Sequence, residues 1–309
     1  MHAKNKKSHR RLPHVHRVLG FFITRVIRHL PDGKRLLYAS RWHRKGLPPV
    51  TIGAHGIPRV TPLVPRPWKK LWAPHRLSWW IAVLFIIGAS CFAIGSHASN
   101  WPWEEFRWLS DGAAIGRIFF VGSIFFTSAA WLQLLESINA DVSDLAQAGG
   151  TVEKQWRWFA WRPRNAGYLA SLIQFIGTLL FNFNTADAMI SGLSWLQQDI
   201  FIWIPNFIGS ICFLVASYLA VIEVSHSIWS FKPRQVSWWI VMLNMLGSVA
   251  FMRAALAGFY RPPAGDLSWA WGANTWTLVG AICFLVASYL MIPESFGAGQ
   301  VVEDVVPDS

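Results

Sequence analysis

Charged residues are scarce in this sequence. Only 14% of its 309 residues are Asp, Glu, Lys or Arg, whereas about a quarter of an ordinary soluble domain is charged. Hydrophobic residues make up 53% of the chain, and 20 residues are Trp. This balance excludes an ordinary soluble domain and predicts an integral membrane protein in contact with the lipid bilayer.

Acidic residues are almost missing from the N-terminal quarter. Up to Arg76 the sequence holds 18 of its 28 basic residues and one acidic residue, Asp32. The net charge of +12 therefore belongs to this segment. A nucleic-acid role for it is unfavoured, because it lacks a recognised binding motif and interleaved aromatic residues.

Cysteine is rare as well. Cys91, Cys212 and Cys283 each lie in an apolar run, which predicts small buried hydrophobic side chains and no disulfide framework. The first long apolar run begins 77 residues into the chain. We therefore expect no cleavable signal peptide and insertion through the chain's own transmembrane helices.

The usual enzyme motifs are absent. There is no Gly-rich phosphate loop, no His-Glu-x-x-His pair, no Gly-x-Ser-x-Gly elbow and no Cys-x-x-Cys pair, which are the patterns that hold phosphates, metals and nucleophiles. Eight of the ten His lie in the N-terminal tail without Cys or carboxylate partners at ligand spacing. We predict that the protein is not an enzyme and has no cofactor or metal.

Six stretches are long and apolar enough to cross a hydrocarbon core of about 30 Å as helices. They are residues 78–96, 115–135, 166–183, 205–222, 237–257 and 275–292. Trp residues gather at their ends and in short connections, as in an interfacial belt. The predicted fold class is an all-α polytopic membrane protein with six transmembrane helices.

The basic residues of the connections predict the orientation. Eighteen precede the first span, four lie between spans two and three, and two lie between spans four and five, against four on the opposite side. Short basic connections stay in the cytoplasm. Both termini should therefore be cytoplasmic.

The even-numbered spans carry a repeated segment. Gly122, Gly209 and Gly280 open the segments GSIFFTSAAWL, GSICFLVASYL and GAICFLVASYL, and a Glu follows each Gly after fourteen positions. These glutamates are Glu136, Glu223 and Glu294. Counted as far as the Glu, the last two segments agree at 11 of 15 positions.

The odd-numbered spans repeat more weakly. Each begins with a Pro, followed four residues later by a small residue, then by an aromatic residue, with a Gly ten positions after the small one. The residues are Pro74, Ser78, Trp79 and Gly88; Pro163, Gly167, Tyr168 and Gly177; and Pro233, Ser237, Trp238 and Gly247. Units of two spans enter the membrane in the same direction. The sequence thus predicts three parallel hairpin repeats around a pseudo-threefold axis, preceded by the basic cytoplasmic tail.

The hairpin with its Gly-Ser-Ile-Cys-Phe-Leu segment resembles the YrhK-like domain, a small two-helix bacterial membrane domain. The likeness covers residues 166–294, with a weaker copy at 75–136. The resemblance implies a protein of the bacterial plasma (inner) membrane. It implies no reaction, ligand or catalytic residue.

The three glutamates occupy the same repeat position at the cytoplasmic ends of the even spans, where the odd spans begin beside basic residues. The candidate ring consists of Glu136, Glu223, Glu294, Arg76, Arg164 and Arg234. We interpret it as structural ion pairs that lock the hairpins together; the alternative is a carboxylate ring at a pore mouth, which selects cations.

Four amides lie inside the spans: Gln133, Gln174, Asn182 and Asn244. They line a polar path or, as we favour, form hydrogen bonds between helices. Arg117 and Arg253 lie near the other end of their spans. Snorkelling or pairing with Asp111 or Asp266 is favoured over anion binding there.

Residues 17–30 place apolar side chains on one helical face and Arg17, Arg25 and Arg28 towards the other. This pattern predicts an amphipathic helix that lies on anionic lipid headgroups. Residues 31–74 are rich in Pro and predict an irregular tether.

The predicted organisation has seven parts. They are a basic tail with the amphipathic helix and tether (1–74), hairpin 1 (75–136), a cytoplasmic loop (137–162), hairpin 2 (163–223), a second loop (224–232), hairpin 3 (233–294) and an acidic cytoplasmic tail (295–309).

Our first functional hypothesis from the sequence is a structural or partner-organising membrane protein, whose protein partners the sequence does not identify. The alternative is a small transporter or channel for an ion or small solute, and the third is an intramembrane enzyme acting on lipid. A transporter needs a polar cavity near mid-membrane, whereas a scaffold should be closed there by Phe, Leu and small residues.

Overall fold

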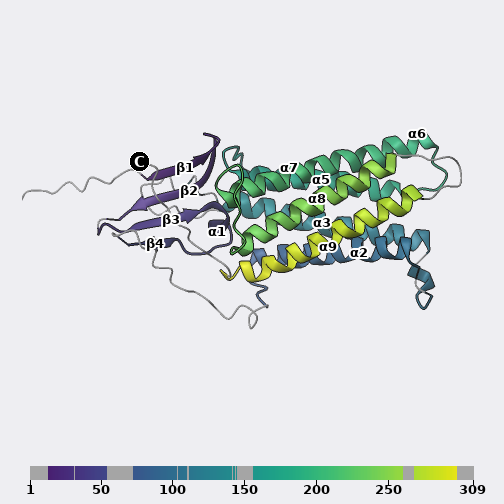
Figure 1. The fold of residues 1–309 in the computed structure, drawn as a ribbon, viewed down its shortest axis with the longest axis horizontal. Coiled ribbons are helices and arrows are strands. Elements are labelled where there is room, and N and C mark those ends of the chain that lie inside the picture. Colours follow the sequence, from purple (N-terminus) through teal and green to yellow (C-terminus); the bar gives the residue numbers. More distant parts are fainter. Residues whose placement is uncertain are drawn as a thin grey trace, which may run out of the picture.

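A small antiparallel sheet lies at one end of a long helical bundle in the computed structural model of the chain (Figure 1). The structure describes residues 13–30, 32–53, 72–102, 104–109, 111–140, 142, 144, 156–259 and 268–297. Much of the predicted tether, the 137–162 loop and the acidic tail lies outside these residues.

Six helices form the bundle. They are α2 (Leu77–Asn100), α3 (Gly112–Asn139), α5 (Ala166–Asp187), α7 (Ile204–Ser225), α8 (Val236–Phe259) and α9 (Ser268–Glu294). Each contains one of the predicted apolar runs, and all six are long and apolar enough to cross a membrane. The prediction of a polytopic helical membrane protein is confirmed at this level.

The helices form a closed ring. Each packs against two neighbours in the order α2, α3, α5, α7, α8, α9, and α9 returns to α2. The centre of the ring is filled by apolar side chains, chiefly Phe, that extend from all six helices. Side chains therefore fill the axis of the ring.

Glycine lets the two helices of a hairpin approach closely at the middle of their length. A Cβ on Gly177 in α5 would lie 2.9 Å from the Cβ of Cys212 and 3.2 Å from the carbonyl oxygen of Gly209, both in α7. A Cβ on Gly88 in α2 would lie 3.0 Å from the carbonyl oxygen of Gly122 in α3. Close backbone approach at small residues is the usual way in which membrane helices pack.

Residues 14–52 form a sheet with a short helix, so the predicted amphipathic helix was wrong, and so was the irregular tether over its described part, residues 32–53. The sheet has the order β1 (His14–Val18), β2 (Phe22–His29), β3 (Arg35–Ala39) and β4 (Val50–Ile52), all antiparallel. Gly20, with φ +67°, forms the turn between β1 and β2, a conformation that suits glycine. The β-branched residues that follow favour a pleated strand over a helix.

The sheet is attached to the bundle. The backbone N–H of Ile23 in β2 donates to the carbonyl of Arg164, which precedes α5, at 2.9 Å. Ile23 and Val26 pack against Val142, which follows α3. The described part of the basic tail is therefore folded against the bundle.

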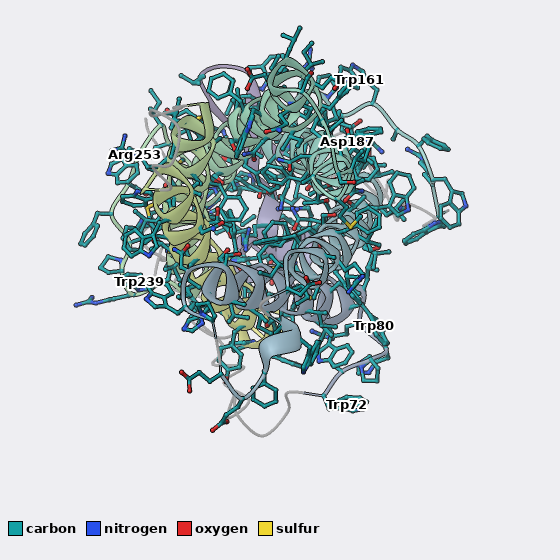
Figure 2. All side chains as sticks on the ribbon, turned by 90° about the vertical axis from the view of Figure 1, so that its right-hand side faces the viewer. Trp72, Trp80, Trp161, Asp187, Trp239 and Arg253 are labelled. Atoms are coloured by element: carbon teal, nitrogen blue, oxygen red, sulfur yellow. The ribbon has the colours of Figure 1, made fainter. Side chains whose placement is uncertain are left out.

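Exposed Trp side chains lie at both ends of the bundle. At the sheet end they include Trp80, Trp161 and Trp239, and at the other end Trp101 and Trp271. Figure 2, seen from the end away from the sheet, shows Trp80, Trp161 and Trp239 at the edge of the bundle. Trp79 and Trp238, near the starts of α2 and α8, are buried.

Candidate functional site

A short helix and the residue after it place three basic side chains at the end of the ring. α1 (Ser40–Arg44) follows β3 directly and stops before Gly46, whose φ of +69° ends the helical conformation. Its positions 40, 41, 44 and 45 share one helical face. That face is buried against the bundle. α1 therefore lies between the sheet and the sheet end of the ring (Figure 1).

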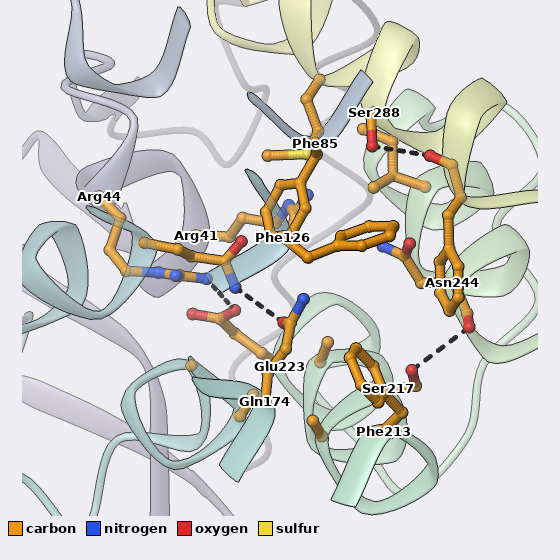
Figure 3. A pocket seen from close by; sticks show the side chains of 18 of the residues that line it. Arg41, Arg44, Phe85, Phe126, Gln174, Phe213, Ser217, Glu223, Asn244 and Ser288 are labelled. Carbon is orange, nitrogen blue, oxygen red and sulfur yellow. Dashed lines mark hydrogen bonds and ion pairs between the residues drawn. The ribbon is translucent and has the colours of Figure 1, made fainter. Parts of the chain in front are cut away.

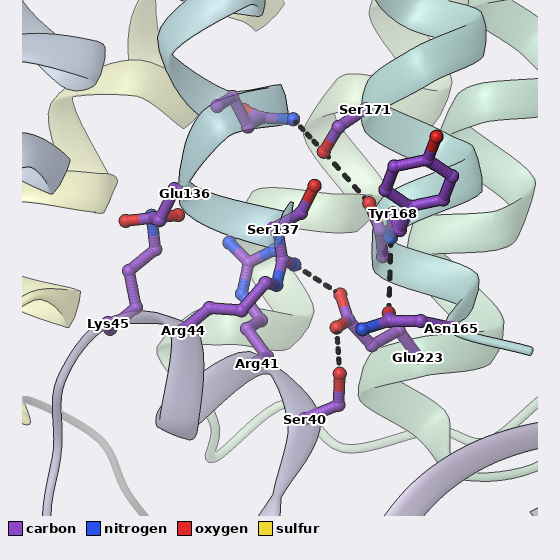
Figure 4. Close-up of polar contacts among 12 residues, drawn as sticks. Ser40, Arg41, Arg44, Lys45, Glu136, Ser137, Asn165, Tyr168, Ser171 and Glu223 are labelled. Carbon is purple, nitrogen blue, oxygen red and sulfur yellow. Dashed lines mark hydrogen bonds and ion pairs between the residues drawn. The ribbon is translucent and has the colours of Figure 1, made fainter. Parts of the chain in front are cut away.

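Each basic residue pairs with one of the three predicted glutamates. Arg41 binds Glu294 through Nε at 2.5 Å and Nη2 at 2.9 Å. Arg44 Nη2 lies 2.5 Å from Glu223 Oε2, and Lys45 Nζ lies 3.2 Å from Glu136 Oε2. We call these six residues the ion-pair cluster; Figure 4 shows part of it.

Hydroxyl groups complete the carboxylate contacts. Ser78 at the start of α2 donates to Glu136 at 2.5 Å, and Ser237 at the start of α8 hydrogen-bonds with Glu294. The corresponding residue at the start of α5 is Gly167, where a Cβ would overlap the Glu223 carboxylate. Ser40 of α1 supplies the hydroxyl there, at 2.6 Å from Glu223 Oε1 (Figure 4).

The cluster balances three positive charges with three negative charges in a nearly dry environment. None of its six side chains is more than 10% exposed. Burial is the largest single influence and would lower the pKa of Arg41, but the charge and hydrogen bond of Glu294, together with the charges of Glu223 and Glu136, outweigh burial and raise that pKa. Such charges persist in a low-dielectric site only when they are paired. The ion-pair cluster, which we also call the latch, therefore carries no net charge and closes the sheet end of the ring.

Behind the cluster lies a small polar cavity, which we call the sheet-side cavity. Its volume is about 50 Å³, which leaves room for about three waters. Gln133, Gln174, Ser217, Asn244 and Ser288 line it together with Arg41, Arg44 and Lys45 (Figure 3). It is thus a pocket in which polar groups from several helices face one another.

Some of these groups bond to one another across helices. Gln133 Nε2 of α3 donates to Gln174 Oε1 of α5 at 3.2 Å. Ser217 of α7 hydrogen-bonds with Ser248 of α8 at 2.8 Å. Arg44 Nε is buried beside the cavity and has no hydrogen-bond partner among the described residues. The amide and hydroxyl groups thus join neighbouring helices around the cavity.

A layer of aromatic rings closes the axis beyond this cavity. We call it the phenylalanine layer; it consists of Phe85, Phe92, Phe126, Phe181, Phe213, Phe251 and Phe284. Neighbouring rings have centroids between 5.0 and 6.2 Å apart, within the range of favourable aromatic pairs. The layer leaves the centre of the ring dry.

A larger cavity, the distal cavity, lies on the other side of the layer. Its volume is about 280 Å³, and Phe92, Phe181 and Phe251 form its boundary with the layer. Trp203 closes part of it from the π-helical segment η3 (Asp199–Trp203), which follows α6 (Trp195–Gln198). Each cavity is lined by residues from all six helices of the ring. The two cavities thus lie on one axis, separated by aromatic side chains.

The predicted arginine partners of the glutamates were wrong. Arg76 donates to the carbonyl of Ser295 and lies over the ring of Phe296 at 5.1 Å. Arg164 and Arg234 are exposed. These arginines precede their helices, whereas α1 reaches the glutamates from inside the ring. The three glutamates do lie in ion pairs, but their partners come from the segment that the sequence placed in a tether.

Three further predicted residues do not form the expected surface. Arg17 is exposed on β1, whereas Arg25 and Arg28 are half-buried on β2. They do not share the basic helical face on which the lipid prediction rested, because the segment is a hairpin. Among the predicted amides, Asn182 lines neither cavity. Arg253 is exposed at the edge of the bundle (Figure 2).

A signal for the latch was present in the sequence. Arg41, Arg44 and Lys45 have helical spacing and equal the glutamates in number.

Comparison of the chain with protein-family models, with curated proteins and with solved structures finds no match. The resemblance to the YrhK-like domain therefore stays a prediction.

Proposed function

We propose that the chain is a multi-pass protein of the bacterial plasma membrane that provides a closed but openable passage for a small solute along the axis of its helical ring. One observation carries this proposal. The ring encloses a cavity of about 50 Å³ and another of about 280 Å³, and a layer of Phe side chains separates them. Hydrophobic constrictions between wet chambers are a recurring gate in membrane pores.

In this proposal the bundle consists of three hairpins around a pseudo-threefold axis, each resembling the YrhK-like domain. Supporting contacts recur at corresponding positions. They are the glycine approaches Gly88–Gly122, Gly177–Gly209 and Gly247–Gly280, and the aromatic pairs Trp72–Trp79, Trp161–Tyr168 and Phe231–Trp238. The central Phe side chains also occur in corresponding triplets, Phe92, Phe181 and Phe251, and Phe126, Phe213 and Phe284.

The sheet end faces the cytoplasm in this proposal. Supporting it, 24 of the 28 basic residues belong to the N-terminal segment and to the two connections on that side, and basic connections remain cytoplasmic. The latch of α1 is then a cytoplasmic closure, and the distal cavity opens towards the other side of the membrane. The glutamates are neutralised within the latch, so they serve as its anchors and not as an exposed cation-selective ring.

A structural role is the second candidate. The complete pairing of the three glutamates and the aromatic filling of the axis favour it, since both suit a permanently closed bundle. A catalytic role is not proposed, because the latch presents three equivalent, fully paired carboxylates instead of a converging set of unlike groups.

The experiment that tests the passage measures osmotic swelling of proteoliposomes in glycerol. The gate variant Phe181→Ala/Phe251→Ala removes two rings that separate the cavities. The matched control is Phe183→Ala, which removes an exposed ring from the same helix α5. We expect the gate variant to leak glycerol severalfold faster than both the control and the wild type.

Both variants are checked for monodispersity and thermal stability before reconstitution. If the folded gate variant is as tight to glycerol as Phe183→Ala, the axis is not a passage. The structural role then becomes the conclusion.

A further inference from the structure

The distal cavity has the form of a small-molecule binding site. Ligand sites in proteins are concave, mostly apolar and lined by aromatic side chains with a few well-placed polar groups. An apolar cavity of about 150 Å³ is large enough to take up benzene, so 280 Å³ holds a substituted ring. Its lining determines which kind of molecule fits.

The apolar part of the lining is aromatic. Phe251 contacts both Phe92 and Phe181, with ring centroids 5.9 and 5.8 Å apart. Phe119 extends the surface from α3, 5.3 Å from Phe92. Trp203 borders the cavity and lies so close to Gly258 of α8 that a Cβ there would overlap its ring. A flat ligand ring thus meets aromatic faces and edges on more than one side.

The polar part of the lining consists of uncharged groups. Asn184 of α5, Asn206 of α7 and Asn274 of α9 line the cavity, and their side-chain amides form no hydrogen bond with the described residues. The other polar side chains of the lining are already engaged: Thr185 donates to the carbonyl of Phe181 at 2.7 Å, and Thr277 to that of Ala273 at 2.9 Å. Three amides, each with donors and an acceptor, are left for a ligand.

No Asp, Glu, Lys, Arg or His side chain lines the cavity among the described residues. Arg117 and Arg253, which lie on helices near it, are exposed on the bundle surface. An ion in this cavity would lose its hydration without gaining a partner of opposite charge, which is costly. An uncharged molecule with one hydrogen-bonding group avoids that cost.

We propose that the distal cavity binds an uncharged molecule with an aromatic ring and an amide or hydroxyl group. This inference rests on the proposed passage, for which it names the class of solute. The phenylalanine layer agrees with it, because an apolar constriction opposes ions far more than it opposes neutral molecules with an apolar body.

The test uses three planar probes of similar shape: benzamide, which is neutral, benzoate, which is negative, and benzamidinium, which is positive. Binding to the full chain in lipid nanodiscs is measured by saturation-transfer NMR, with empty nanodiscs as the blank for partition into lipid. We expect benzamide to bind at least about tenfold more tightly than either ion, since tenfold corresponds to about 1.4 kcal/mol.

Two variants of one helix assign the site. Asn184→Leu removes a lining amide, and Asn182→Leu removes an amide of α5 that does not line the cavity. We expect Asn184→Leu to weaken benzamide binding several-fold and Asn182→Leu to leave it unchanged. Equal affinity for the three probes, no benzamide binding above the blank, or equal effects of the two variants would overturn the inference.

The outcomes separate this inference from the passage. Benzamide binding that depends on Asn184, together with a tight Phe181→Ala/Phe251→Ala variant, retains the binding site and removes the passage. A glycerol leak in that variant without benzamide binding retains the passage and removes the assigned solute.

Discussion

The axis of the ring is closed twice, and the two closures are built from different materials. The ion-pair cluster joins residues from two parts of the molecule, a short helix on the sheet and the ends of three bundle helices. The phenylalanine layer consists only of side chains of the bundle itself. The first closure is removed when the sheet leaves the bundle, whereas the second opens only when rings or helices move.

The closures also differ in how they respond to substitution. A buried ion pair depends on both partners, because one charge left alone in a dry site is strongly destabilising. An apolar layer tolerates exchanges that conserve volume. The predictions below measure this difference, beginning with the largest expected effect.

Removing one charge from the cluster should cost most. We expect Arg44→Met to lower the free energy of unfolding by about 3–5 kcal/mol, because it leaves Glu223 buried without its partner. Unfolding of the detergent-solubilised protein by denaturant measures this. Arg162→Met is the control, since Arg162 pairs with the partly exposed Asp144, and such pairs contribute about 0–1 kcal/mol. Equal losses in the two variants would contradict a buried latch.

A methyl group in the seam of a hairpin should cost less. Gly177→Ala places its Cβ 2.9 Å from that of Cys212, and we expect a loss of about 1–3 kcal/mol from overpacking. Gly272→Ala near the start of α9 is the control, because nothing lies within 4 Å of its Cβ. The same unfolding measurement compares them, and a Gly177→Ala variant as stable as the control argues against close helix approach.

A conservative exchange in the phenylalanine layer should cost least among these. Phe284→Leu keeps an apolar side chain of similar size in the layer, and we expect a loss below about 1.5 kcal/mol. Its comparison with Arg44→Met tests whether the apolar closure is the more tolerant one. A larger loss for Phe284→Leu than for Arg44→Met would reverse our ranking of the closures.

The junction between sheet and bundle should also respond to pH. Burial, followed by the charges of Arg25, Lys232 and His16, lowers the pKa of His226 well below its usual 6.5. The unfolded chain takes up a proton as pH falls through 6.5 while the folded chain does not. Stability is therefore fully present above pH 6.5 and declines below it.

The variant His226→Asn should reduce this decline. His226 has a φ of +54° at the end of α7, and Asn adopts that conformation readily. Thermal unfolding from pH 7.5 to 5.0 measures the slope for both proteins. An unchanged slope in the variant would assign the pH dependence to other groups.

The bundle was predictable because a long apolar run that crosses lipid has to form a helix. Every span of 18 or more apolar residues must satisfy its backbone internally, so the runs at 78–96 and 166–183 identify α2 and α5. The glutamate positions followed from the repeat. Their environment did not, because a repeat fixes a position along a helix and not the partner across space.

The N-terminal sheet was missed because short segments fit two periods. Residues 22–29 place apolar side chains on one face of a helix as well as within a strand, and only Gly20 and the β-branched residues argued for the strand. The pairing of Arg41 with Glu294 spans 253 positions in sequence. A contact of that range depends on the whole fold, which no local pattern encodes.

The latch has a consequence for the order of biosynthesis. Arg41, Arg44 and Lys45 leave the ribosome before any of their partners, and Glu294 belongs to the last helix of the ring. Until α9 has been inserted, Arg41 lacks the carboxylate with which it pairs. Docking of α1 before that point would bury an unpaired positive charge. Docking of α1, which is synthesised first, thus depends on the insertion of α9, which is synthesised last. The latch therefore forms only when the ring is complete.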